Sequence, residues 1–332
     1  MRVAINGFGR IGRNVFRLLA RRTDIEVVAI NDVAPDSPLV YLLKHDSVMG
    51  DFDGVVELKD GRLSAGTQNS RLVKGRVPSE LPWRAEHVDI VIEATGRFRS
   101  RAELEGHLVA GAQKVLLTVP AKDDIDAMVV IGANEETLKP EHRLVSNASC
   151  TTNCLAPLAR VLDERFGIVK GIMTTVHAYT NDQRLADWAH SDLRRSRAAG
   201  ENIIPTSTGA ARAVGKVLPR LKGKLDGMAM RVPVPDGSIV DLVAELACTV
   251  TIEQVNDAMR AAADGKHRGI IAYSTDAVVS SDIIGNPHSC IFDAPLTQVI
   301  AQNTIKVFAW YDNEWGYSSR VVDLLPLMMR GA

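Results

Sequence analysis

The first 150 residues alternate short apolar runs with longer stretches whose apolar positions recur at helical spacing. The apolar runs lie at 3–6, 27–31, 88–95 and 114–119. The stretches with helical spacing lie between them, as at 10–22 and 101–112. Strands that are apolar on both faces and alternate with helices favour a parallel, doubly wound sheet. We therefore expect an α/β first domain.

After residue 150 the pattern changes to strict alternation within single strands. In 238–250 one face carries only small or apolar side chains: Val240, Leu242, Ala244, Leu246, Cys248 and Val250. Alternation of this kind predicts a half-buried strand of a mixed or antiparallel sheet, with companions at 171–179, 228–234 and 304–312. We expect a second, α+β domain over 150–313, and a first domain formed by 1–149 together with 314–332.

Composition and charge narrow the class of protein. The 332 residues carry 39 Lys and Arg against 40 Asp and Glu. Without a basic excess we expect neither a nucleic-acid nor a membrane partner. No apolar run reaches the length of a membrane span, and the first residues, MRVAINGFGR, lack a signal-peptide pattern. Four scattered cysteines do not form a disulfide framework, so we expect a cytoplasmic protein.

A nucleotide-binding pattern follows the first predicted strand. GFGRIG supplies Gly7, Gly9 and Gly12 between that strand and a helix, where glycines permit a tight turn and close approach of a pyrophosphate. Asp32 ends the second predicted strand, 20 residues after Gly12, where a carboxylate can accept both ribose hydroxyls. The alternative is a glycine-rich turn with Asp32 as a solvated loop acid. We predict a Rossmann-type domain that binds NAD.

A cysteine lies among small polar residues in SNASCTTN. The helical spacing that follows, through Leu155, Leu158 and Leu162, predicts a helix that begins at or near Cys150. Unpaired N–H groups and the positive end of the helix dipole favour a thiolate there. An inert buried thiol is the alternative. A metal site is not expected, because no Cys or His pair has zinc-like spacing.

A nucleophilic thiol needs a base, and His177 is the candidate. It ends a predicted strand, in TTVHAYT, whereas most of the other histidines lie in polar, surface-like contexts. A satisfied structural histidine is the alternative reading of His177.

Three further segments carry groups that bind anions. DLRRSR holds Arg194, Arg195 and Arg197, and 206–209 places hydroxyls and a glycine at the start of a helix. Arg231 lies within a predicted strand, where an unpaired guanidinium would be costly. A solvated charged face and ordinary helix caps are the alternatives for the first two segments.

Taken together, these motifs resemble phosphorylating glyceraldehyde-3-phosphate dehydrogenase from end to end. The resemblance rests on GFGRIGR, SNASCTTN, TTVHAYTNDQ, DLRRSRAAGENIIPTSTGAA, GMAMRVPVPDG and AWYDNEWGYSSR. It implies oxidation of glyceraldehyde 3-phosphate, with NAD and inorganic phosphate, to 1,3-bisphosphoglycerate through a Cys150 thioester, with His177 as the base. It also implies a homotetramer and a role in glycolysis or gluconeogenesis.

The resemblance also implies the remaining site residues. For substrate and phosphate these are Ser149, Thr151, Thr180, Arg195, Thr208, Gly209 and Arg231. For the cofactor they are Gly7, Gly9, Arg10, Ile11, Gly12, Asp32, Arg76, Thr118 and Asn313, of which Asn313 would fix the carboxamide.

Two departures and two alternatives complete the prediction. Trp188-Ala189 stands where NAD-specific relatives commonly have Leu-Pro, and VAPDSP after Asp32 is also unusual, so we expect some tolerance of NADP. An erythrose-4-phosphate dehydrogenase is the nearest alternative function. A non-catalytic binding or scaffold member of the family is an alternative from a different class.

Overall fold

The computed structural model describes residues 1–330, which divide into two compact units. The first unit contains residues 1–129, 136–149 and the segment from 318 onward, and the second contains 130–135 and 150–317. These units differ from the predicted domain boundaries at 130–135 and 314–317, whose contacts lie within the second unit.

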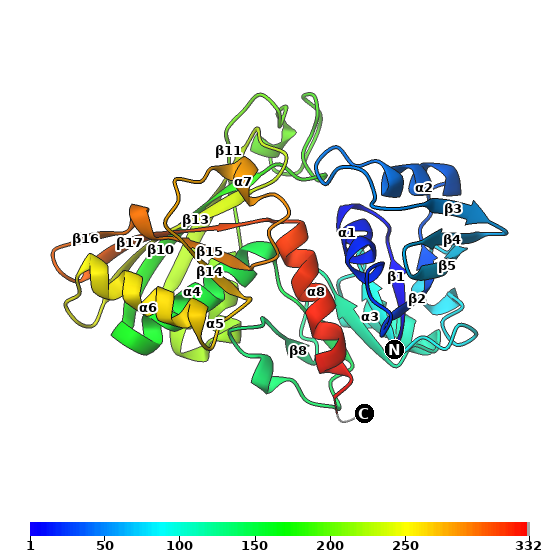
Figure 1. Ribbon diagram of the computed structural model, residues 1–332, viewed down its shortest axis with the longest axis horizontal. Helices are drawn as coiled ribbons and strands as arrows, with labels where there is room; N and C mark the ends of the chain where they lie inside the picture. Colours follow the sequence, from blue (N-terminus) through cyan, green and yellow to red (C-terminus); the bar gives the residue numbers. More distant parts are fainter. Residues whose placement is uncertain (331–332) are drawn as a thin grey trace. The chain divides into compact units, whose positions relative to one another are not determined.

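The first unit is built on a sheet that, within residues 1–330, has nine strands in the order β3-β4-β5-β2-β1-β6-β7-β9-β8 (Figure 1). Its strands are β1 (Arg2–Asn6), β2 (Glu26–Asn31), β3 (Val56–Lys59), β4 (Arg62–Ala65), β5 (Gln68–Val73), β6 (Ile90–Glu93), β7 (Lys114–Leu117), β8 (Ala127–Met128) and β9 (Leu144–Ser146). From β5 to β8 all pairs are parallel. The predicted doubly wound α/β class is confirmed.

An antiparallel addition at one edge of this sheet was not predicted. Strands β3, β4 and β5 form a meander, in which Asp60 and Gly61 turn the chain with positive φ angles of 50° and 71°. The three strands are short, and β3 has no buried position, so neither a long apolar run nor a clear alternation marks them in the sequence.

Helices α1 (Arg10–Leu19), α2 (Asp36–Lys44) and α3 (Arg101–Val109) belong to the first unit. The predicted helices at 10–22 and 101–112 are therefore present but end three residues early. Ser100 and Glu103 form a capping box that fixes the start of α3. Most of the last helix, α8 (Trp315–Met328), also belongs to this unit.

The second unit contains a mixed sheet, eight-stranded within residues 1–330, as expected. Its path is β11 (Ile204–Ser207), β12 (Leu225–Val232), β10 (Ile168–Ala178), β13 (Ser238–Leu246), β17 (Thr304–Tyr311), β15 (Cys290–Asp293) and β14 (Ile271–Ser274), with β16 (Gln298–Ile300) paired to β17. Its long central strands β10, β13 and β17 pair antiparallel, whereas β10 pairs with β12 in parallel.

The alternation predicted along 238–250 holds only as far as Leu246. Val240, Leu242, Ala244 and Leu246 are at most 1% exposed, whereas Cys248 is exposed and lies beyond the end of β13. The chain leaves the sheet here because the N–H of Ala247 donates to the carbonyl groups of Phe166 and Gly167 instead of to a strand. Placing Cys248 on the buried face was therefore wrong.

Helix α4 (Cys150–Phe166) packs against β15 and β17 and is accompanied by α5 (Ala210–Val217), α6 (Ile252–Asp264) and the short α7 (Ser280–Ile283). Short 3₁₀ turns are η1 (Pro78–Glu80), η2 (Glu135–Thr137), η3 (Arg194–Ser196), η4 (Pro219–Leu221) and η5 (Ala294–Leu296). Among residues 1–330 no helix is both long and apolar enough to cross a membrane.

Candidate active site

A thiol and an imidazole meet in the second unit. Cys150 is the first residue of α4, and His177 is the penultimate residue of β10. Because α4 packs on the sheet that contains β10, the Sγ atom of Cys150 lies 3.4 Å from Nε2 of His177. The structure thus brings together the two residues that the sequence proposes as nucleophile and base.

The hydrogen bonds of the imidazole define its tautomer. Nδ1 of His177 lies 2.7 Å from the carbonyl oxygen of Ala178, a distance that would place two lone pairs face to face unless Nδ1 carries the proton. Nη1 of Arg231 also lies 3.1 Å from Nδ1, but Ala178 and Thr180 accept the two protons of Nη1 at 3.0 Å each. Nδ1 therefore donates to Ala178, and the lone pair of Nε2 faces the thiol. Tyr311 holds the ring from the side, edge to face, with centroids 5.9 Å apart.

Burial opposes a charge on either partner when each is considered alone. It lowers the pKa of His177 to about 3, and the positive charge of Arg231 contributes to the same shift. It also raises the pKa of Cys150, against the effects of the Arg231 charge and of hydrogen bonds from Thr151. Burial of the sulfur therefore opposes the thiolate that the N-terminus of α4 favours.

Moving the proton from Sγ to Nε2 creates both charges at once. At 3.4 Å two opposite unit charges attract by about 5 kcal/mol at an effective dielectric constant near 20. This attraction exists only when both groups are charged, so it offsets part of the desolvation that each group suffers. The imidazole is therefore the group that makes a thiolate accessible at Cys150.

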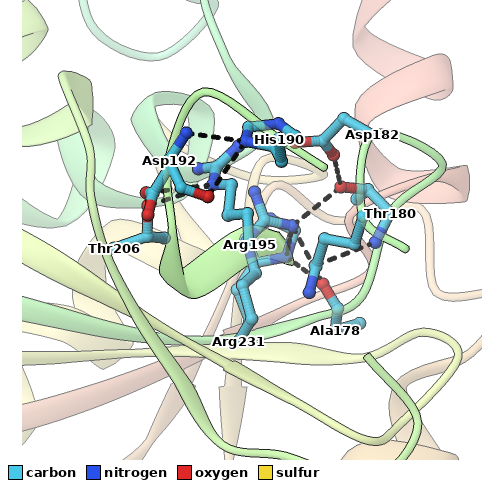
Figure 2. Close-up of polar contacts among 10 residues, drawn as sticks. Ala178, Thr180, Asp182, His190, Asp192, Arg195, Thr206 and Arg231 are labelled. Atoms are coloured by element: carbon cyan, nitrogen blue, oxygen red, sulfur yellow. Dashed lines mark hydrogen bonds and ion pairs between the residues drawn. The ribbon is translucent and has the colours of Figure 1, made fainter. Parts of the chain in front are cut away.

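Arg231 and Thr180 form a cationic corner (Figure 2), and Nη1 of Arg231 lies 3.1 Å from Nδ1 of His177. Nη1 of Arg231 donates to the carbonyl oxygen of Ala178 and to Oγ1 of Thr180, each at 3.0 Å. Arg231 lies on β12, next to His177 in the parallel register of β10 and β12. A negatively charged group of a ligand would find a guanidinium and a hydroxyl here, within reach of the reactive pair.

Asp182 connects this corner to Arg195 (Figure 2). Its carboxylate accepts a hydrogen bond from Oγ1 of Thr180 and forms an ion pair with Arg195. Burial opposes ionisation of Asp182, but the Thr180 bond and the charges of Arg231 and Arg195 outweigh it and lower its pKa. Nε of Arg195 also donates to Thr206 at 3.0 Å.

The N-termini of α4 and α5 lie side by side. Oγ1 of Thr152, in the first turn of α4, lies 3.4 Å from the carbonyl oxygen of Ala210, the first residue of α5. Gly209 caps α5, and a Cβ there would meet no atom within 4 Å, so the space in front of this N-terminus is open. Two adjacent helix N-termini favour an anion.

Thr151 and Thr208, both predicted to hold phosphate, use their hydroxyls locally. Thr151 is buried, and its Oγ1 lies 2.9 Å from the Tyr311 hydroxyl, so the side chain turns into the core. Oγ1 of Thr208 accepts a hydrogen bond from the N–H of Ala210. Ser149 immediately precedes α4 and is partly exposed. An anion at the N-termini of α4 and α5 would therefore be bound mainly by backbone N–H groups.

The predicted cofactor cleft is present in the first unit. It is lined by Asn6, Gly7, Gly9, Asn31, Asp32, Val33, Gly75, Arg76, Ala94, Thr95, Arg97 and Phe98. Gly7 has a φ of 98°, and a Cβ there would lie 2.6 Å from the backbone nitrogen of Thr95, so only glycine fits. A Cβ at Gly9, the cap of α1, would meet nothing within 4 Å and would fill the space that a pyrophosphate needs.

Asp32 is placed in the cleft as a dinucleotide site requires. Asp32 lines the cleft, and its two oxygens accept the N–H groups of Phe8 at 2.8 Å and Ala34 at 2.9 Å. These bonds fix the carboxylate and leave lone pairs for ribose hydroxyls. A Cβ at Gly12 would strike the carbonyl oxygen of Gly7, so Gly12 lets α1 approach the turn.

Besides Gly12, four predicted cofactor residues lie outside the lining of this cleft. The Arg10 side chain pairs with Asp46, and Ile11 follows it in the first turn of α1, so these two would contribute N–H groups. Oγ1 of Thr118 donates to the carbonyl oxygen of Glu93 at 3.0 Å. Asn313 belongs to the second unit, where its Oδ1 accepts a 2.6 Å hydrogen bond from Ser238.

Sequence reasoning missed Tyr311, Asp182 and Ser238. Tyr311 is buried at the end of β17, where alternation predicts a core position but not a contact with His177. Asp182 lies in the motif TTVHAYTNDQ and Ser238 begins the predicted strand region 238–250, and neither receives a role there. Among residues 1–330 no group of three or more His, Cys, Asp or Glu side chains could hold a metal ion.

Known proteins are similar in sequence to this chain over nearly its whole length. Residues 1–101 match the sequence model "Glyceraldehyde 3-phosphate dehydrogenase, NAD binding domain", and residues 149–313 match the C-terminal domain of the same family. The glyceraldehyde-3-phosphate dehydrogenases of Streptomyces coelicolor and Geobacillus stearothermophilus are each 55% identical, over 98% of this chain and 97% of theirs. That of Mycolicibacterium smegmatis is 52% identical, over 99% and 98%.

The fold and these matches define an NAD-dependent oxidoreductase that acts on an aldehyde. The chain belongs to the glyceraldehyde-3-phosphate dehydrogenase family.

We predict that His177→Asn slows the reaction of Cys150 with iodoacetamide at neutral pH, because the acceptor for the thiol proton is lost. Labelling is followed by mass spectrometry in a Cys248→Ser background, since Cys248 is exposed and would also react. Equal labelling rates with and without the imidazole would show that the helix N-terminus, and not His177, activates the sulfur.

Proposed function

We propose that the protein oxidises D-glyceraldehyde 3-phosphate, with NAD and inorganic phosphate, to 1,3-bisphosphoglycerate. The observation that carries this proposal is the Cys150–His177 pair, 3.4 Å apart, beside the cationic corner of Arg231 and Thr180. A phosphorylated aldehyde needs both a nucleophile for its carbonyl carbon and a cation for its phosphate.

Cys150 and His177 carry the first step. Nε2 of His177 takes the thiol proton while Sγ attacks the aldehyde carbon, and then gives that proton to the former carbonyl oxygen, which leaves a hemithioacetal and a neutral imidazole. The N–H groups at the start of α4 stabilise the developing oxyanion. Nδ1 stays bonded to Ala178, which holds the ring in position through the proton transfer.

The substrate phosphate assists this proton transfer. The charge of Arg231 lowers the pKa of His177, so an anion that binds Arg231 reduces this repulsion and favours the imidazolium. Binding of the phosphorylated substrate thus raises the pKa of His177 before the proton is transferred. The bond from Thr180 adds a neutral donor to the same phosphate.

Oxidation leaves an acyl group on Cys150 as a thioester, while His177 takes the hydroxyl proton of the hemithioacetal. NAD supplies the hydride acceptor when it is bound, and Gly9, Asp32 and Arg76 are the residues of the first unit proposed to hold it. Asn313, oriented by Ser238, is proposed to hold the carboxamide.

Inorganic phosphate then attacks the thioester carbon and releases Cys150 as the thiolate. The paired N-termini of α4 and α5, with Gly209 at the cap, are the proposed binding site for this phosphate. Arg195, linked through Asp182 to Thr180, is proposed to serve both anions.

We also propose that the protein forms a homotetramer and that it is cytoplasmic. Leu185, Trp188 and Leu193 are 94%, 73% and 82% exposed within one segment. Large apolar side chains gathered on a surface in this way support a subunit contact.

We predict that Arg231→Leu lowers kcat/KM for glyceraldehyde 3-phosphate by about 10-fold to 100-fold, the usual worth of a charge-assisted hydrogen bond. The same substitution should change kcat/KM for unphosphorylated glyceraldehyde much less. Steady-state kinetics with both aldehydes make the comparison. Equal losses would remove Arg231 from the proposed phosphate site.

We further predict NAD preference with measurable use of NADP. A 2′-phosphate about 4 Å from Asp32 costs on the order of 4 kcal/mol at an effective dielectric constant near 20, before screening. Trp188-Ala189, proposed to reach the ribose of a neighbouring subunit, lacks the rigid proline of a Leu-Pro pair. Trp188→Leu/Ala189→Pro should therefore lower the NADP-to-NAD ratio of kcat/KM. An unchanged ratio excludes this segment from cofactor selection, and a wild type that prefers NADP contradicts the role of Asp32.

A further inference from the structure

A carboxylate without a cationic partner is buried behind the cofactor cleft. Glu93, the last residue of β6, is 0% exposed, and its hydrogen-bond partners are all uncharged. Oε1 accepts the N–H and the hydroxyl of Thr95, and Oε2 accepts Nδ2 of Asn6 and Nε2 of His107. A buried charge is costly unless such bonds compensate it, so this arrangement requires a reason.

The neighbouring bonds show that each of these groups faces Glu93 as a donor. The indole N–H of Trp83 donates to Nδ1 of His107 at 2.9 Å, which leaves the ring proton on Nε2, toward Glu93. Oδ1 of Asn6 accepts from Asn31 at 2.7 Å, so its amide nitrogen faces the carboxylate. The Thr95 hydroxyl accepts from the N–H of Arg97 at 3.1 Å and gives its own proton to Glu93. Four donors converge on one ionised carboxylate.

The same groups form the walls of the cleft. Asn6, Thr95 and Asn31 line it. Asn31 also clamps Gly75, accepting its N–H at 2.7 Å and donating to its carbonyl oxygen at 3.0 Å. Gly7 rests on the backbone of Thr95, so closely that a Cβ would lie 2.6 Å from its nitrogen. The turn that faces the pyrophosphate therefore lies on a segment that Glu93 fixes.

We propose that Glu93 is a positioning residue of the cofactor cleft, which sets NAD affinity by fixing Thr95 and Asn6 without touching NAD. The inference rests on NAD binding and does not require the dehydrogenase reaction proposed above. Wild type that binds NAD but lacks that activity would refute the reaction and leave this inference intact.

The test compares Glu93→Gln with Trp83→Phe as a matched control. Glu93→Gln keeps the side-chain volume but turns an amide NH₂ toward the donors that now face a carboxylate. The resulting unsatisfied donor should displace Thr95 or Asn6, and we expect the Kd for NAD to rise about 10-fold or more. Trp83→Phe removes one bond of the same network without touching Asn6 or Thr95, so it should lower Tm and leave the Kd within about twofold. Calorimetric titration with NAD gives the Kd, and thermal unfolding gives Tm.

Equal Kd values for wild type and Glu93→Gln, with a lower Tm, would make Glu93 merely structural and overturn the proposal. So would a rise in Kd that Trp83→Phe reproduces at a matched loss of Tm. If Glu93→Gln does not fold, Glu93→Asp takes its place. It keeps the charge but retracts it by one methylene, and a several-fold weaker NAD affinity is expected. An unchanged Kd in that variant would overturn the proposal in the same way.

Discussion

The proton between Sγ of Cys150 and Nε2 of His177 is the feature on which the proposed chemistry depends. Burial disfavours either charge alone, and the attraction across 3.4 Å offsets part of that cost when both charges form together. The surrounding groups hold Sγ and Nε2 at this separation. Helix α4 begins at the sulfur, Ala178 fixes the ring through Nδ1, and Tyr311 packs against its edge. Arg231 adds a condition, because its charge opposes the imidazolium until an anion arrives.

In the proposed function, each unit binds an anion with backbone groups at the ends of its helices. In the first unit Gly9 keeps the space in front of the N-terminus of α1 clear, and Asp32 lines the same cleft. In the second unit two helix N-termini lie together, and side-chain cations supply the charge.

The sequence predicts what local patterns determine. Alternation along β13 and the apolar runs of β1 and β2 predict the two sheets. Cys150 and His177 are candidates because the sequence places them at the start of a helix and at the end of a strand. Contacts that depend on the tertiary fold cannot be predicted from the sequence pattern around either residue. Tyr311 against His177, Asp182 between Thr180 and Arg195, and the donors around Glu93 are examples. The inward turn of Thr151 and the pairing of the short strands β3–β5 escape prediction because each depends on tertiary contacts that the local sequence does not encode.

The most direct test of the proposed mechanism is a stopped-flow measurement of NADH formation from glyceraldehyde 3-phosphate and NAD, with and without inorganic phosphate. A covalent thioester predicts a burst that approaches one NADH per Cys150 without phosphate, and steady turnover only when phosphate is added. Cys150→Ser should lack the burst and still bind NAD. Steady turnover without phosphate, or a burst in Cys150→Ser, would contradict the mechanism.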